Sequence, residues 1–146
     1  GELGGLPTLI YIDTNVIISY VDELDSNHEK ARMLVESLGG DRIVSRLTLV
    51  ELVSVYSRAG LEEPVTLAVY SIDSVKARMV DVNFNYVLEA AVRKAHTLKL
   101  KTLDLLHVIT CKASGCFGFA TLDLDIVKKA DVIEKELGIR VITVSR

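Results

Sequence analysis

The sequence is poor in cysteine and has no long apolar run. Its two cysteines, Cys111 and Cys116, stand four residues apart without a second pair, which excludes a disulfide framework and a zinc knuckle. We expect buried thiols at a helix end, as in a reducing compartment. No stretch reaches the roughly 18 apolar residues of a membrane span. The most apolar one, LIYIDTNVIISYV, is interrupted by Asp13 and Asn15.

A surplus of positive charge is also missing. The chain has 17 Lys and Arg residues against 20 Asp and Glu residues, a formal charge of −3. Proteins that hold nucleic acid on a broad basic face usually have the opposite balance. The charge therefore argues against that mode of binding, but it leaves open binding through local cations.

The remaining composition is that of an ordinary globular domain. The 146 residues fit one domain of about 100–200 residues. The apolar share of 49% and the charged share of 25% exclude disorder and a collagen-like fibre. We expect a single domain over 8–146. Residues 1–7 lack the basic and apolar regions of a signal peptide, and we expect them to be a flexible segment or a non-native remnant. A cytoplasmic protein follows as an expectation.

Short β-branched and aromatic runs alternate with helical patterns along the chain. The predicted strands are 8–12, 42–45, 79–82, 117–121 and 140–144. The predicted helices cover about 27–38, 47–58, 64–77, 84–98 and 103–114, with further helical segments between the last two strands. This alternation predicts an α/β layer fold with a mainly parallel sheet, whose ligands collect beyond the carboxyl ends of the strands.

Acidic residues follow two of these strands. Asp13 comes directly after the first strand, and Asp123 and Asp125 follow the fourth strand after Thr121. If the two strands are neighbours, these acids meet at one edge of the sheet. An Asp in this place is also common as a turn residue or a helix cap, and Asp125 has two lysines one helical turn further on, so both interpretations stay open.

Two further acids lie within apolar helices. Glu51 belongs to a helix with apolar residues nearly all round, which predicts a largely buried helix, and no cation lies one turn away. Buried acids are seldom unpaired, so Glu51 needs a metal or a distant Arg or Lys. Asp104 opens the helix 103–114, where the helix dipole alone would favour an acid. His107 shares its face, and a lone histidine there is more often a supporting or core residue than a ligand.

Together these acids suggest a cation site. Two unit charges 4 Å apart repel by about 4 kcal/mol at an effective dielectric constant near 20. Hard cations such as Mg²⁺ and Mn²⁺ relieve that repulsion and prefer oxygen ligands. One or two of them can bridge a phosphodiester and activate water. With the four acids set aside, the 17 basic residues exceed the remaining acidic ones by one, so the rest of the chain is compatible with a nucleic-acid substrate.

Four segments resemble the PIN-domain ribonucleases, especially the small VapC toxins. They are YIDTNVIISY (11–20), SRLTLVELVSVY (45–56), KTLDLLHVITCKA (101–113) and ATLDLDIVKKA (120–130). The resemblance rests on the order Asp, Glu, Asp, Asp and covers nearly the whole chain. It implies a parallel five-stranded sheet with helices on both faces.

The resemblance also implies roles for individual residues. The catalytic and metal-binding acids would be Asp13, Glu51, Asp104 and Asp123, with Asp125 as an outer or additional metal ligand and with Asn15 and Thr121 orienting the site. The implied activity is hydrolysis of RNA with one or two Mg²⁺ or Mn²⁺ ions. Members of the family form homodimers, and the toxins bind a small antitoxin.

Other interpretations remain. Arg46, Lys99 and Lys101 flank the acidic edge and would contact RNA phosphates, unless they are solvated loop charges. A haloacid dehalogenase-like site would need a second Asp where this chain has Asn15. A PIN-like scaffold, or an RNA-processing subunit with little turnover of its own, is the alternative function.

Overall fold

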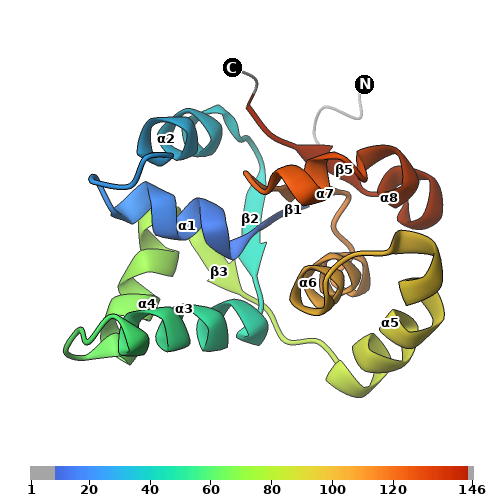
Figure 1. Cartoon of the computed structure of the whole chain (residues 1–146), viewed down its shortest axis with the longest axis horizontal. Coiled ribbons are helices and arrows are strands. Elements are labelled where there is room, and N and C mark those ends of the chain that lie inside the picture. The colour runs from blue at the N-terminus through green and yellow to red at the C-terminus, as the bar shows by residue number, and fades with distance from the viewer. Residues whose placement is uncertain (1–8, 145–146) are drawn as a thin grey trace.

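The sheet at the centre of the molecule has five parallel strands (Figure 1). A computed structural model describes residues 9–144, so the expected extension at 1–7 lies outside the described residues. The strand order is β3-β2-β1-β4-β5. The strands are β1 (Leu9–Ile12), β2 (Asp41–Val44), β3 (Ala77–Met79), β4 (Gly118–Ala120) and β5 (Arg140–Ile142). The predicted parallel five-stranded sheet is confirmed.

Strand β1 lies at the middle of the sheet and pairs with both β2 and β4. Tyr11 is in register with Ile43 on one side and with Phe119 on the other. Because side chains alternate along a strand, Ile10 and Ile12 pack into the core on one face, while Tyr11 packs into the core on the other. Both faces are covered, which explains why the strand sequences are almost continuously apolar.

Helices cover both faces of the sheet, as expected (Figure 1). One core is built with α1 (Thr14–Val21), α2 (His28–Ser37), α3 (Arg46–Arg58) and α4 (Pro64–Ser74). The other is built with α5 (Phe84–Leu98), α6 (Thr102–Ala113), α7 (Leu124–Val127) and α8 (Ala130–Leu137). The α/β architecture is therefore that of three layers, with the carboxyl ends of β1 and β4 side by side.

Three local expectations were incomplete or wrong. Helix α1 was not predicted, because its β-branched residues continue the pattern of β1; the Asp13 side chain accepts a hydrogen bond from the Thr14 amide and starts the helix. Helix α3 is not largely buried: Val50 is 66% exposed, because one side of the helix faces solvent. Helix α4 ends at Ser74, and the chain turns at Lys76, where φ is 58°, so β3 begins earlier than predicted.

The cysteines match their prediction. Cys111 lies in α6, Cys116 follows the end of that helix, and both are buried free thiols. Among the helices of residues 9–144, none has the length and apolarity that a membrane crossing requires.

Candidate active site

The carboxyl ends of β1 and β4 bring two acids to one edge of the sheet. Asp13 directly follows β1, and its amide donates to the Ala120 carbonyl at 2.9 Å, which extends the pairing of the two strands by one step. Asp123 follows β4 and caps α7 by accepting a hydrogen bond from the Asp125 amide at 2.8 Å. Both acids therefore act as helix caps, as the non-catalytic interpretation of their position predicts. For Asp123 this role uses Oδ1, and Oδ2 accepts no hydrogen bond from the described residues.

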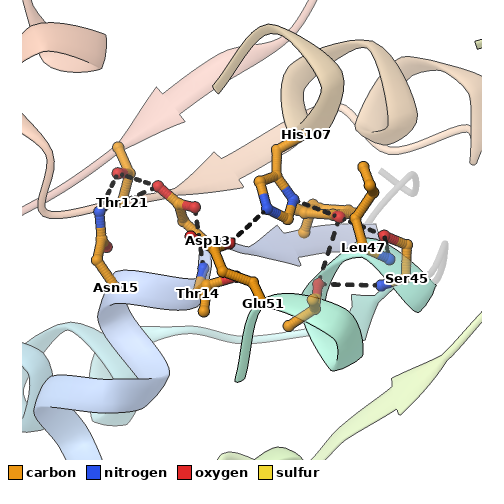
Figure 2. Close-up of polar contacts among 10 residues, drawn as sticks. Asp13, Thr14, Asn15, Ser45, Leu47, Glu51, His107 and Thr121 are labelled. Carbon is orange, nitrogen blue, oxygen red and sulfur yellow. Dashed lines mark hydrogen bonds and ion pairs between the residues drawn. The ribbon is translucent and has the colours of Figure 1, made fainter. Parts of the chain in front are cut away.

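Asp13 is the most enclosed acid of the group, with 4% of its surface exposed. Its Oδ1 accepts from the Thr14 amide at 2.9 Å, and its Oδ2 accepts from the Thr121 hydroxyl at 2.7 Å and from the Asn15 amide group at 3.1 Å. Burial raises the pKa of Asp13, although the nearby His107 and the Thr121 hydrogen bond oppose that rise. These hydrogen bonds fix the carboxylate in one orientation (Figure 2).

Asn15 and Thr121 also hold the segment that leads to Asp123. The Thr121 hydroxyl accepts a hydrogen bond from the Asp123 amide at 3.0 Å, and the Asn15 side chain accepts one from the Leu122 amide at 3.2 Å. The same two side chains thus contact Asp13 and set the path of the chain toward Asp123.

Glu51 lies in α3 with 29% of its side chain exposed. Its Oε1 is 2.9 Å from Nε2 of His107 in α6. Within residues 9–144 no Arg or Lys pairs with Glu51; His107 takes that place. Partial burial is the largest single influence and tends to raise the pKa of Glu51. The His107 hydrogen bond, the Thr14 side chain and the charge of His107 together outweigh it, and the net shift is downward. The lowered pKa favours the ionised carboxylate at neutral pH.

Asp104 opens α6 and is partly buried beside the other acids. Burial and then the negative charges of Asp123 and Asp13 raise its pKa to about 6. Glu51 acts in the same direction, and only His107 opposes it. No Lys or Arg is among the described groups that act on Asp104. The four predicted acids therefore form one electrostatic group in which, within residues 9–144, His107 is the only basic side chain acting on Asp104.

The chemistry of this group fits a hard divalent cation. All the donors are carboxylate oxygens, and their mutual repulsion adds to the effect of burial in raising the Asp104 pKa. The buried Thr14 hydroxyl lies next to Asp13 and helps to lower the pKa of Glu51, so it places a neutral oxygen beside these two acids. Nevertheless, within residues 9–144 no three His, Cys, Asp or Glu side chains lie close enough together to bind one ion directly. A cation that retains several of its waters suits this wider spacing.

Comparison with known families decides the classification. The family model of the PIN domain matches residues 10–132, which is most of the chain. The chain belongs to the PIN domain family. A search of curated proteins found no significant match.

Several solved structures share the fold of this chain. VapC20 of Mycobacterium tuberculosis, described as a sarcin–ricin loop cleaving toxin, has 17% identity and a TM-score of 0.66 over 82% of this chain and 93% of that chain. VapBC-1 of nontypeable Haemophilus influenzae has 16% identity and a TM-score of 0.62 over 93% and 98%. FitAcB of Neisseria gonorrhoeae has 18% identity and a TM-score of 0.60 over 92% and 96%. At such low identity, these likenesses establish the PIN-domain fold.

The remaining predicted site residues lie around the edge of the PIN-domain acid group. The Asp125 side chain is 60% exposed and 3.9 Å from Nζ of Lys101, and it is not among the charges that raise the Asp104 pKa.

Arg46 pairs with the exposed Asp81 at 2.9 Å. Lys99 caps the end of α5 and donates to the His96 carbonyl at 2.9 Å. These basic side chains are exposed, and none contacts the four acids.

The sequence did not predict the chain of contacts that leads from Glu51 through His107 and Tyr11 to Ser45. Nδ1 of His107 is 2.8 Å from the hydroxyl of Tyr11, which is 2.7 Å from the hydroxyl of Ser45. Figure 2 labels Glu51, His107 and Ser45 of this chain of contacts, beside Asp13. The only signal in the sequence was the spacing of three residues between Asp104 and His107, which places both on one side of α6.

Proposed function

We propose that this PIN-domain protein is a metal-dependent endoribonuclease that hydrolyses RNA phosphodiester bonds, and that it is the toxin of a toxin–antitoxin pair. The observation that carries the proposal is the group of four acids that no Lys or Arg of the described residues contacts, in which Asp104 has a pKa of about 6. The repulsion between these carboxylates destabilises the fold unless the group binds a cation. In an open α/β sheet such as that of the PIN domain, ligands bind beyond the carboxyl ends of the strands, where this group lies.

We assign Asp13, Glu51, Asp104 and Asp123 to the binding of one or two Mg²⁺ or Mn²⁺ ions. When bound, such an ion polarises the phosphodiester and activates a water molecule. Asp13 is kept in place by Thr121 and Asn15, and His107 holds Glu51. At pH values near or below its pKa of about 6, Asp104 would have to lose a proton for a cation to bind, which couples cation binding to pH. Asp125 sits further out and serves as an additional acid.

The substrate and partners follow from the same comparison. The similar structures include a toxin described as cleaving the sarcin–ricin loop and complexes of toxin with antitoxin, which supports an RNA substrate and a small antitoxin partner. Arg46, Lys99 and Lys101 are exposed near the acidic edge and are our candidates for contacts with RNA phosphates. Exposed apolar residues on α4, among them Val65 and Tyr70, support a homodimer.

Cleavage of RNA tests the proposal directly. We expect the purified protein to cleave a single-stranded or hairpin RNA with Mg²⁺ or Mn²⁺ and to lose this activity with EDTA. Because water is the attacking group, the products carry no cyclic 2′,3′-phosphate, which separates this activity from that of a contaminating ribonuclease that uses the 2′-hydroxyl.

A matched pair of variants assigns the activity to the site. Asp104 and Asp131 are both acids in the first turn of a helix, but Asp131 lies in α8 and is exposed. Asp104→Asn should abolish metal-dependent cleavage, and Asp131→Asn should leave it unchanged. Full activity in Asp104→Asn, or equal loss in both variants, would contradict the proposed site.

A further inference from the structure

His107 is a buried polar residue that makes contacts with both of its ring nitrogens. Only 1% of its side chain is exposed. Nε2 is 2.9 Å from Glu51 Oε1, and Nδ1 is 2.8 Å from the hydroxyl of Tyr11. We infer that His107 is a positioning residue that fixes the Glu51 carboxylate for the cation, and that Tyr11 fixes the ring of His107. This inference rests on the metal-dependent function proposed above.

The two contacts determine where the ring proton lies. An ionised carboxylate can only accept hydrogen bonds, so Nε2 must carry the proton and donate it to Glu51. In the neutral ring, Nδ1 is then an acceptor, and the Tyr11 hydroxyl is the donor that faces it. The Tyr11 ring is itself held in place, stacked on Phe119 with the ring centres 5.6 Å apart. The Nε2–H tautomer is thus imposed by the surroundings of the ring.

The contacts also tie Glu51 to the start of its own helix. The Tyr11 hydroxyl is 2.7 Å from Ser45 Oγ, and Ser45 is the N-cap of α3. The path therefore leads from the N-cap of α3, across β1 and α6, and back to Glu51 within α3. Since Asp13 comes two residues after Tyr11, the same path sets the position of Glu51 relative to Asp13.

Without this support Glu51 would lose its fixed position. Its side chain is partly exposed, and a free glutamate has several rotamers that reach solvent. A residue that orients a metal ligand typically changes metal affinity about 10–100-fold when it is removed. Loss of His107 should therefore weaken cation binding while the other acids remain in place.

The decisive experiment compares Mn²⁺ affinity by titration calorimetry in His107→Leu and His107→Gln. The Gln amide can donate from about the position of Nε2, whereas Leu cannot donate. We expect His107→Leu to bind Mn²⁺ about 10–100-fold more weakly than the wild type, and His107→Gln to recover most of that loss. Equal affinities in the wild type and both variants would overturn the inference, as would equal losses without rescue by Gln.

Two further measurements apply if His107→Leu does not fold. ¹⁵N–¹H correlation spectra of the wild type should show the Nε2–H tautomer, and an Nδ1–H tautomer would overturn the inference.

Tyr11→Phe should weaken Mn²⁺ binding severalfold, while Tyr56→Phe should not. Both variants lose a buried hydroxyl contact of 2.7 Å, but Tyr56 contacts Ser71, away from the acids. Equal effects of the two variants would also overturn it.

These outcomes separate the inference from the proposed function. If the wild type binds Mn²⁺ with the expected dependence on His107 but cleaves no RNA, the ribonuclease function fails and the positioning role stands. If the wild type binds no Mn²⁺, the positioning role itself fails.

Discussion

The Thr121 hydroxyl donates a hydrogen bond to Asp13 Oδ2 at 2.7 Å and accepts one from the Asp123 amide at 3.0 Å. One buried hydroxyl thus connects the acid that follows β1 with the acid that follows β4. Because both contacts use the same oxygen, replacing it affects both acids at once. The arrangement makes Thr121 a direct test of how the edge of the sheet is held together.

Thr121→Val should destabilise the protein by about 1–3 kcal/mol, because it removes one of the three donors to the buried Asp13 carboxylate and leaves the Asp123 amide without its side-chain acceptor. Thr110 is the matched control: it is also fully buried, but its hydroxyl makes no hydrogen bond within the described residues. Thr110→Val should therefore be neutral or stabilising. Urea denaturation of both variants measures the difference, and similar losses in both would contradict the role of Thr121.

The stability of the metal-free protein should fall as pH rises from about 4 to about 6. The pKa of Asp104 in the folded protein is about 6, above its ordinary value of 3.8, so the folded state binds more protons in this window and loses stability as the pH rises. Asp13 acts in the same direction because its pKa is also raised, and Glu51 acts in the opposite direction because its pKa is lowered.

Asp104→Asn removes the charge that causes this effect. It should stabilise the metal-free protein at pH 7 by about 1 kcal/mol, once the partial exposure of Asp104 is allowed for, and have little effect at pH 4. Thermal melts in EDTA at several pH values measure this. Asp131→Asn should show no such dependence on pH, and a constant effect of Asp104→Asn at every pH would contradict the assigned pKa.

Adding Mn²⁺ should stabilise the wild type by about 2.7 kcal/mol when its concentration is 100 times the dissociation constant.

The same titration distinguishes the two candidates for the fourth acid. Asp123 is one of the charges acting on Asp104, whereas Asp125 is exposed and lies beside Lys101. Asp123→Asn should lose most of the Mn²⁺-dependent stabilisation, and Asp125→Asn should retain it. Asn is also an acceptable helix cap, so Asp123→Asn should keep α7. The opposite ranking would make Asp125 the fourth acid.

The sheet and its acidic edge could be predicted from sequence because they depend on local patterns. Each strand is a short apolar run, and the carboxyl ends of neighbouring parallel strands must meet, which brings Asp13 and Asp123 together. The boundaries between α4 and β3 were less predictable, because the positive φ of Lys76 ends the helix without a glycine or proline to mark it. The exposure of Val50 also escaped prediction, since an apolar pattern does not show which side of a helix lacks a neighbour.

The support behind Glu51 depends on contacts that no local pattern contains. Glu51 and His107 are 56 positions apart, and Tyr11 and His107 are 96 apart. The sequence identifies Tyr11 as an apolar strand residue and His107 as a core histidine. Both rings are indeed buried in the core. Only the packing of α3, β1 and α6 shows that their polar atoms form one chain with Glu51.

RNA binding should depend more on divalent cations than on general basic charge. The formal charge is −3, and the exposed candidates for phosphate contacts are Arg46, Lys99 and Lys101. Fluorescence anisotropy with a hydrolysis-resistant phosphorothioate RNA should show at least about a tenfold loss of affinity when EDTA replaces Mn²⁺. With three phosphate contacts to a single strand, the slope of log K against log salt should be about −2. Equal affinity with and without Mn²⁺ would contradict binding through the acid group, because phosphates would otherwise be repelled by its four carboxylates. A slope much steeper than −2 would instead indicate a broad basic surface, which this composition does not supply.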